Sequence, residues 1–201
     1  MPSECVKGTL LLGVVVSVRR LRDRGVISPD ALEARVSKEA VALVDQKIEI
    51  ARWYPMHAFC ELIDVDWVIA GRGEPTYLED QGARSADRLF DTRMYQQLDF
   101  AERSGKVESR ERLIRQARLI TTITGSFYNF LKVDVTLAER SLDIVYANAT
   151  AFAKPLEHTT VGFMNQINVR QGSKRRWTSE RVRPDEVHFR MSLPERLAGQ
   201  T

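Results

Sequence analysis

The residues best suited to acid–base or metal chemistry in this sequence are its three histidines, His57, His158 and His188. His57 and Cys60 stand three positions apart in a segment with helical periodicity, so both side chains could lie on one side of a helix. A zinc site needs three or four ligands, and no further ligand stands at a suitable spacing from this pair. The sequence therefore predicts no metal site, and a polar contact in a packed helix for His57 and Cys60.

The acidic residues and glycines show no catalytic motif. Two acidic pairs, Asp64 with Asp66 and Asp185 with Glu186, are interpreted as solvated surface groups. The sequence has no GxSxG nucleophile elbow, and the glycines at 71 and 73 lack the spacing of a phosphate-binding loop. We therefore predict no catalytic residue.

An enzyme with an unrecognised site stays an alternative. His57 and Glu61 stand four positions apart, a spacing at which a helix can pair two side chains. Together with Tyr128, they would be the first residues to substitute in a search for activity.

The strongest charge cluster is basic and consists of Lys174, Arg175, Arg176 and Trp177. The net charge of +3 and the pI of about 9.0 are compatible with a nucleic-acid partner but do not require one. Cationic side chains bind phosphates, and an aromatic ring can stack on a base. A nucleic-acid-associated regulator that uses residues 170–183 is therefore a second alternative, although acidic residues nearby dilute the charge.

Two groups of three aromatic residues stand at junctions between predicted elements. They are Trp53, Tyr54 and Phe59, and Phe127, Tyr128 and Phe130. These side chains either fill the core or border an apolar pocket between the helical half and the sheet. The predicted ligand-binding residues are Trp53, Tyr54, His57, Phe127 and Tyr128.

The elements that would position these residues begin with a helical first half. Ser28, followed by Pro29, and Ser37 are predicted helix N-caps, and Gly25 is a predicted helix end. Hydrophobic periodicity predicts one helix at 7–24, two short helices after Ser28 and Ser37, and further helices at 55–70, 75–91, 93–103 and 109–124. Gly125 is predicted to end the last of them.

The second half of the chain has the alternation of β-strands. Strands are predicted at 130–137 and 142–146 and in a hairpin of 177–183 with 187–193, and a helix at 159–169 is inserted. The predicted class is α+β, with an N-terminal helical bundle packed on a small C-terminal antiparallel sheet with one inserted helix. One domain is expected over 1–201, with a helical half at 7–124, a sheet half at 126–193 and a tail at 194–201.

The cellular compartment is predicted from cysteines and hydropathy. Two cysteines are too few for a disulfide framework, which favours a reducing, cytoplasmic location. The longest apolar run, at 10–18, is shorter than the roughly 20 residues of a membrane span, so neither a membrane anchor nor a signal peptide is expected.

Several short phrases carry a resemblance to a known group of proteins. They are Lys7-Gly8-Thr9, Trp53-Tyr54-Pro55, Gly82-Ala83-Arg84-Ser85-Ala86 and Gly162-Phe163. In these phrases and in the order of its elements, the chain resembles paralogous, mostly uncharacterised bacterial proteins related to the 4-vinyl-reductase, haem–nitric-oxide-binding and TRAPP-type superfamily. The resemblance implies a helical bundle against a twisted antiparallel sheet, and a small-molecule-binding or dimerising module that often lacks catalysis.

The same resemblance bears on cofactors. Haem-binding relatives present an axial histidine and a Y-x-S-x-R signature; this sequence lacks the signature, and His57 comes too early to match the axial position. The cysteine-rich metal motif of some vinyl-reductase relatives is missing as well. No cofactor is predicted. The favoured function is a non-enzymatic sensory or scaffold domain in signalling, which binds an apolar small molecule or a protein partner and forms a homodimer.

Overall fold

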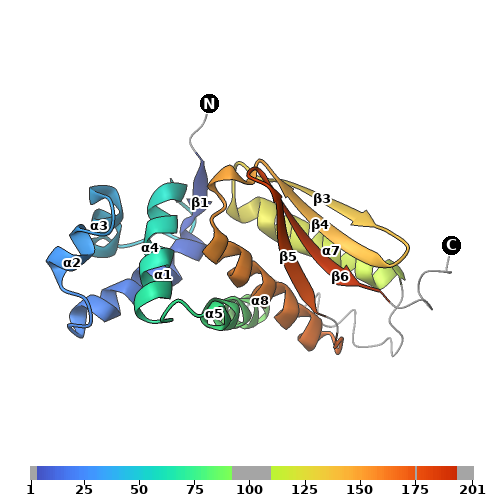
Figure 1. Cartoon of the computed structure of the whole chain (residues 1–201), viewed down its shortest axis with the longest axis horizontal. Coiled ribbons are helices and arrows are strands. Elements are labelled where there is room, and N and C mark those ends of the chain that lie inside the picture. Colours follow the sequence, from blue (N-terminus) through green and yellow to red (C-terminus); the bar gives the residue numbers. More distant parts are fainter. Residues whose placement is uncertain (1–3, 92–109, 175, 194–201) are drawn as a thin grey trace.

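The computed structural model describes residues 4–91, 110–174 and 176–193 of the 201-residue chain. A helical N-terminal region lies at one end of the elongated molecule and a four-stranded antiparallel sheet at the other (Figure 1). This arrangement confirms the α+β class predicted from the sequence. In the part of the chain that the structure describes, no helix is long and apolar enough to cross a membrane.

The N-terminal region begins with helices whose ends follow local sequence signals. α1 spans Gly8–Asp23, α2 Pro29–Glu33, α3 Lys38–Asp45 and α4 Met56–Ile69. Oγ of Ser28 and Oγ of Ser37 each accept a hydrogen bond from the backbone N–H three residues later, at 3.2 and 3.3 Å. Gly25 adopts φ 68°, the left-handed conformation that ends a helix. All three predicted signals are confirmed.

A two-stranded sheet that the sequence did not predict ties this region together. β1 (Cys5–Lys7) pairs antiparallel with β2 (Trp53–Pro55), which leads directly into α4. Val6 of β1 also forms an isolated antiparallel bridge with Tyr128, the residue directly after α7 (Arg110–Phe127), so the chain at the end of that helix joins the same pair. Strands of three residues are too short to show the alternation that reveals a strand in a sequence.

The closest helix contact joins α5 (Pro75–Phe90) and α8 (Lys154–Arg170). A Cβ added to Gly82 would lie 1.9 Å from the carbonyl oxygen of Thr159, and one added to Gly162 would lie 1.9 Å from the carbonyl oxygen of Glu79. Because each glycine lies directly against the backbone of the other helix, no larger residue fits at either position. The contact fixes the relative position of two helices that also line a cavity.

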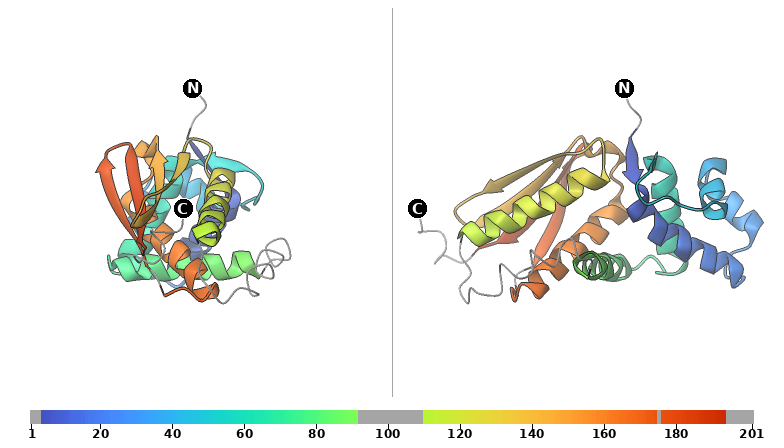
Figure 2. Two further views of the ribbon diagram at one scale, coloured as in Figure 1. Left: turned by 90° about the vertical axis from the view of Figure 1, so that its right-hand side faces the viewer. Right: turned by 180° about the vertical axis from the view of Figure 1, so that it is seen from behind.

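The C-terminal sheet has the strand order β3-β4-β6-β5, and each neighbouring pair is antiparallel. β3 spans Lys132–Leu137, β4 Ser141–Ala147, β5 Trp177–Arg183 and β6 Glu186–Ser192. One face of the sheet is covered by two helices, with α7 (Arg110–Phe127) over β3 and β4 and α8 over β5 (Figure 2). Ile144, Tyr146 and Phe189 are fully buried between the sheet and these helices.

A buried hydrogen-bond cluster holds α7, α8 and β5 together. Oδ1 of Asn168 accepts hydrogen bonds from Nε2 of Gln116 and from the indole Nε1 of Trp177, the latter at 3.3 Å. The backbone N–H of Trp177 donates to Oδ1 of Asn165 at 2.7 Å. Trp177 is 1% exposed, so its ring belongs to the core.

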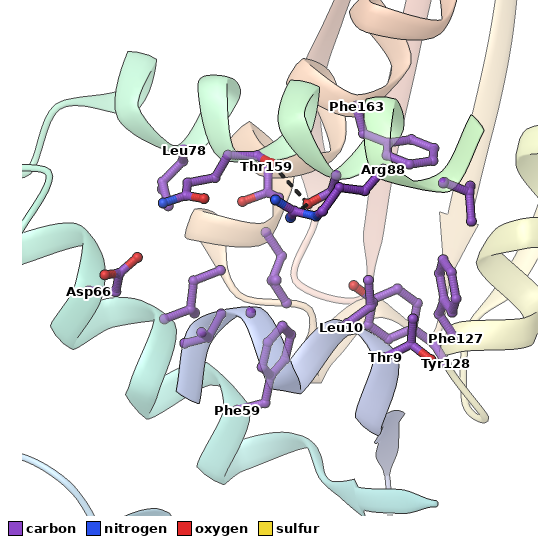
Figure 3. Close-up of a pocket in the computed structure, with 17 residues that line it drawn as sticks. Thr9, Leu10, Phe59, Asp66, Leu78, Arg88, Phe127, Tyr128, Thr159 and Phe163 are labelled. Atoms are coloured by element: carbon purple, nitrogen blue, oxygen red, sulfur yellow. Dashed lines mark hydrogen bonds between the residues drawn. The ribbon is translucent and has the colours of Figure 1, made fainter. Parts of the chain in front are cut away.

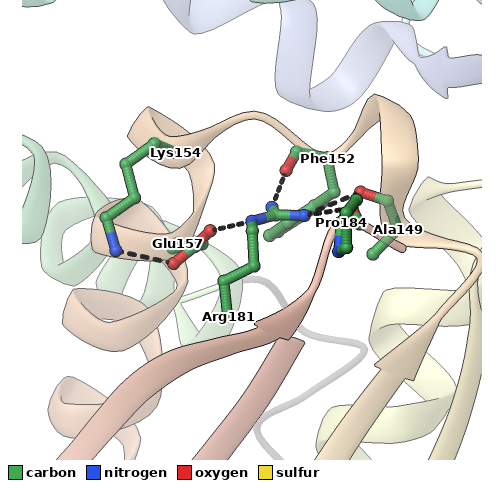
Figure 4. Close-up of polar contacts among 6 residues, drawn as sticks. All are labelled: Ala149, Phe152, Lys154, Glu157, Arg181 and Pro184. Atoms are coloured by element: carbon green, nitrogen blue, oxygen red, sulfur yellow. Dashed lines mark hydrogen bonds and ion pairs between the residues drawn. The ribbon is translucent and has the colours of Figure 1, made fainter. Parts of the chain in front are cut away.

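A second polar cluster fastens the β5–β6 hairpin to the start of α8 (Figure 4). The fully buried carboxylate of Glu157 accepts hydrogen bonds from Nε of Arg181 at 2.9 Å and from Nζ of Lys154 at 2.8 Å. The Arg181 guanidinium also donates to the carbonyl oxygens of Ala149, Phe152 and Pro184. A buried carboxylate requires such partners, because an isolated charge is strongly unfavourable away from water.

Some predicted boundaries are wrong or fall outside the described residues. α7 continues through Gly125 to Phe127, because Gly125 does not adopt the left-handed conformation that would end the helix. α8 begins at Lys154 rather than at 159, with Pro155 in its first turn. The helix predicted at 93–103 and the tail at 194–201 lie outside the described residues.

Candidate functional site

A cavity of about 320 Å³ lies among the helices (Figure 3). It is lined by α1, α4, α5 and α8 and by the C-terminal end of α7. The sequence predicted a pocket between the helical half and the sheet, whereas the described residues that line this cavity belong to helices from both halves of the chain, or directly follow one, and to no strand.

Most of the cavity wall is apolar. The aliphatic and aromatic side chains that line it are Leu10, Val14, Phe59, Ile63, Leu78, Leu89, Phe127, Leu156 and Phe163. A wall of this kind binds a ligand by removing apolar surface from water, which contributes roughly 25 cal/mol per Å². A concave, mostly apolar site with a few polar groups is the usual form of a small-molecule site.

Tyr128, directly after α7, is the polar group that reaches the interior of the cavity. Figure 3 shows its ring lying beside Phe127 and extending toward Leu10. Tyr128 is 8% exposed, and no hydrogen bond to its hydroxyl is formed within the described ranges. Burial raises the pKa of Tyr128 well above its ordinary value, so the hydroxyl keeps its proton and is a donor. A buried tyrosine hydroxyl ordinarily has a partner, so this one is available to a ligand.

A row of polar side chains follows α5 along the cavity wall. Oγ of Ser85 donates to the carbonyl oxygen of Gln81 at 2.9 Å and accepts from Nη2 of Arg88 at 2.9 Å. Arg88 is exposed and also lines the cavity, so its guanidinium lies where the cavity meets solvent. Among the residues that the structure describes, no carboxylate forms an ion pair with Arg88.

Asp66 of α4 contributes a buried carboxyl group to the lining. Its Oδ1 accepts a hydrogen bond from Oγ of Ser17 at 2.5 Å, and its Oδ2 accepts one from the hydroxyl of Tyr77 at 3.0 Å. Burial raises the pKa of Asp66, while the two hydroxyl donors oppose that shift. The interpretation of Asp66 as a solvated group is wrong, because α4 turns this side chain inward to 3% exposure while Asp64 remains exposed.

Gly13 of α1 lies at the opening of the cavity. It is exposed and lines the cavity, and a Cβ added to it would meet no heavy atom within 4 Å. Thr9, one turn earlier on the same helix, is exposed as well, and its hydroxyl donates to the carbonyl oxygen of Ile50 at 3.0 Å. The opening therefore lies along a face of α1 with small side chains.

The predicted ligand-binding residues are divided between the cavity and other places. Phe127 and Tyr128 line the cavity, and Trp53, Tyr54 and His57 do not. Trp53 is 39% exposed, with Nζ of Lys7 at 4.0 Å from its ring centroid. The hydroxyl of Tyr54 accepts a hydrogen bond from the backbone N–H of Glu49 at 2.9 Å, so Tyr54 holds the β1–β2 region in place.

The predicted pairing of His57 with Glu61 is replaced by other contacts. Nε2 of His57 lies 2.9 Å from the Glu39 carboxylate, and the side chain is 59% exposed. Oε2 of Glu61 instead accepts hydrogen bonds from the backbone N–H and the hydroxyl of Ser37, at 2.8 and 2.6 Å. Tyr128 lines the cavity, whereas His57 and Glu61 do not, so these three side chains do not form one site.

The basic cluster near the C-terminus is likewise dispersed. Trp177 is in the core and is not available to stack on a base. Arg170 forms ion pairs with Asp87 and Asp91, at 2.7 and 2.9 Å. Lys174 and Arg176 are exposed, and Arg175 lies outside the described residues.

Metal-ligating side chains do not gather in the described ranges. Within them, no three His, Cys, Asp or Glu side chains come together in a way that could hold a metal ion. The Sγ of Cys60 lies 3.5 Å from the carbonyl oxygen of Ala151, and burial raises the pKa of its thiol to about 11.

Comparison of the whole chain with known proteins identifies its fold. No protein-family model and no curated protein sequence matches the chain. A solved structure that matches is a point mutant of an H-NOX protein from K. algicida in the Fe(II) unliganded state. The TM-score is 0.59 at 16% sequence identity, and the match covers 96% of this chain and 100% of that one. The chain therefore has an H-NOX-like, haem–nitric-oxide-binding-type fold.

Proposed function

We propose that this chain is a sensory domain that holds a small, mainly apolar molecule in the cavity among α1, α4, α5 and α8. The cavity of about 320 Å³ with its largely apolar wall carries the proposal, and the H-NOX-like fold supports it. This volume corresponds to roughly ten water-sized groups, since one water takes about 30 Å³ of liquid. At about 0.8 kcal/mol per buried CH₂, burying a chain of that size gains about 8 kcal/mol, which is of the same order as the cost of association.

Catalysis is not part of the proposal. The titratable side chains in the described part of the lining are Asp66, Arg88 and Tyr128. The Arg88 guanidinium carries only hydrogen-bond donors, and burial keeps the proton on Tyr128. Asp66 has both oxygens engaged by hydroxyl donors. A nucleophile beside a general base, which covalent catalysis requires, is not among these lining groups.

Haem is not part of the proposal either, because the lining residues do not fit it. Haem iron is held by histidine, cysteine, methionine or tyrosine. Within the described residues, the lining contains none of the first three, and the raised pKa of Tyr128 disfavours the phenolate that would bind iron. The histidines of the chain, His57, His158 and His188, are all outside the lining.

The decisive experiment closes the opening of the cavity without unfolding the protein. Gly13→Leu places a side chain at the opening, whereas Gly125→Leu makes the same change in α7, outside the lining. At both glycines a Cβ would meet nothing within 4 Å, so each leucine side chain starts in open space, and each change favours its helix by up to about 1 kcal/mol.

The measurement is a fluorescence titration with 1-naphthylamine, a small neutral dye whose emission depends on the polarity of its surroundings. We expect the wild type and Gly125→Leu to bind the dye equally, and Gly13→Leu to bind it at least about tenfold more weakly. Equal binding by all three proteins, or no binding by the wild type, would refute the proposal.

The proposal includes a homodimer, which is supported by the family resemblance of the sequence. Sedimentation velocity at micromolar concentration tests it. A single boundary at the mass of the 23.0 kDa chain would contradict the dimer and leave the cavity proposal intact.

A further inference from the structure

We infer that the ligand is a medium-chain carboxylic acid, with its carboxylate on Arg88 at the cavity opening and a second oxygen along its chain bound by Tyr128. This inference rests on the proposed function and adds the chemical class of the ligand. It places a negative head group at the solvent edge, an apolar chain inside, and one polar atom within the apolar part.

The position of Arg88 argues for a negatively charged head group. Among the residues that the structure describes, it is the one cationic side chain of the lining, and it is held toward the cavity wall by its 2.9 Å hydrogen bond to Ser85. The neighbouring carboxylates of Asp87 and Asp91 are already bound by Arg170, at 2.7 and 2.9 Å. A guanidinium without a carboxylate partner binds a carboxylate through parallel hydrogen bonds, in the geometry that arginine favours.

The other charged group of the lining does not favour a cationic ligand. Asp66 is 3% exposed, and both of its oxygens accept hydrogen bonds from hydroxyl groups, of Ser17 and Tyr77. An ammonium group would have to give up its hydration to reach a carboxyl that is already hydrogen-bonded and buried. A carboxylate at Arg88 meets no such obstacle, because Arg88 faces solvent.

Tyr128 argues for a second oxygen. Its hydroxyl is buried and has no hydrogen bond within the described ranges, and its side chain reaches into the cavity (Figure 3). A purely hydrocarbon chain would leave this donor unsatisfied, which is unfavourable in an apolar site. A ketone or hydroxyl oxygen on the chain would accept the hydrogen bond, and the size of the cavity limits the whole molecule to roughly ten to twelve non-hydrogen atoms.

Isothermal titration calorimetry with four amphiphiles of equal chain length tests the head group. We expect octanoate to bind about tenfold more tightly than 1-octanol and octyltrimethylammonium, and at least as tightly as octyl phosphate. Arg88→Gln should remove this advantage without weakening 1-octanol, whereas Arg84→Gln, an exposed arginine one turn away and outside the lining, should bind octanoate like the wild type.

The outcomes of this titration distinguish a wrong head group from a wrong proposed function. Equal binding of octanoate and 1-octanol, unaffected by Arg88→Gln, would overturn the carboxylate and leave the proposed function standing. Tighter binding of octyl phosphate would overturn it in favour of a phosphate. If neither these amphiphiles nor the neutral dye binds, the proposed function itself fails.

The second oxygen is tested with octanoic acids that carry a ketone at carbon 4, 5, 6 or 7. We expect at least one of them to bind the wild type about fivefold or more tightly than octanoate, since a satisfied buried hydrogen bond is worth about 1 kcal/mol. Tyr128→Phe should abolish that preference and bind octanoate unchanged. If Tyr128→Phe binds all five acids as the wild type does, the second oxygen is overturned.

Discussion

The contact between α5 and α8 makes Gly82→Ala a sensitive test of the fold. An added Cβ would lie 1.9 Å from the carbonyl oxygen of Thr159 and 2.8 Å from the backbone nitrogen of Phe163. Real Cβ atoms essentially never approach other heavy atoms below 3.0 Å, so the two helices would have to separate by about 1 Å. Because both neighbouring atoms belong to the backbone, no side-chain rotation can relieve the clash.

Two opposing effects set the size of the change. Alanine is favoured over glycine inside a helix by about 1 kcal/mol. Overpacking a close contact costs roughly 1–3 kcal/mol, and here the loss extends along two helices whose whole interface is shifted. Because both clashing atoms are backbone, we take the upper end of that cost, about 3 kcal/mol, and after the helical gain of about 1 kcal/mol we expect Gly82→Ala to lower the free energy of unfolding by about 2 kcal/mol.

Urea denaturation followed by circular dichroism measures this change, with Gly125→Ala as the control. Gly125 is a helical glycine whose Cβ would meet nothing, so this control should gain up to about 1 kcal/mol. Opposite signs for two identical substitutions would be difficult to explain without the contact. A Gly82→Ala protein at least as stable as the wild type would refute the packing described for α5 and α8.

Two further predictions concern buried carboxylates. Glu157→Gln should lower the free energy of unfolding by roughly 3 kcal/mol, because it leaves the Arg181 guanidinium without its buried partner (Figure 4). Arg183→Gln removes the exposed ion pair with Glu186 and should leave the free energy of unfolding nearly unchanged. Equal effects of the two substitutions on the urea midpoint would contradict this prediction. For Asp66, burial raises the pKa above the 3.8 of an ordinary aspartate, so the folded state keeps the proton to a higher pH than the unfolded state. The free energy of unfolding of the wild type, measured relative to that of Asp66→Asn, should therefore fall as the pH rises from about 4 to the folded-state pKa, and stay constant above it. If this difference in free energy rises over the same pH range, the pKa of Asp66 is lowered on folding and the prediction is wrong.

The helices could be predicted from the sequence wherever their ends depend on neighbouring residues. Ser28 and Ser37 cap helices through bonds that span three residues, and Gly25 ends a helix through its own backbone conformation. Gly125 shows the limit of such signals. A glycine ends a helix only if it adopts the left-handed conformation, and the packing of α7 against β3 and the β1–β2 pair keeps Gly125 helical.

The candidate site was only partly predictable. Phe127 and Tyr128 could be identified because the sequence alone shows two adjacent aromatic residues at a junction between predicted elements. Arg88 and Asp66 were not, because an arginine or an aspartate on a polar helix face is most often solvated. Their place in the lining depends on how α1, α4 and α5 come together, which is determined by long-range packing.

The shape of the cavity depends on three glycines, which have no side chain at positions where one would change the structure. Gly82 and Gly162 let α5 and α8 come into backbone contact, and this contact sets the position of the wall that carries Arg88. Gly13 has the opposite effect, because the space in front of it is empty and the cavity opens there. The three glycines are therefore not interchangeable: a larger residue should damage the fold at the first two and close the site at the third. Of substitutions at these three glycines, only one at Gly13 is thus expected to abolish ligand binding in a stable protein.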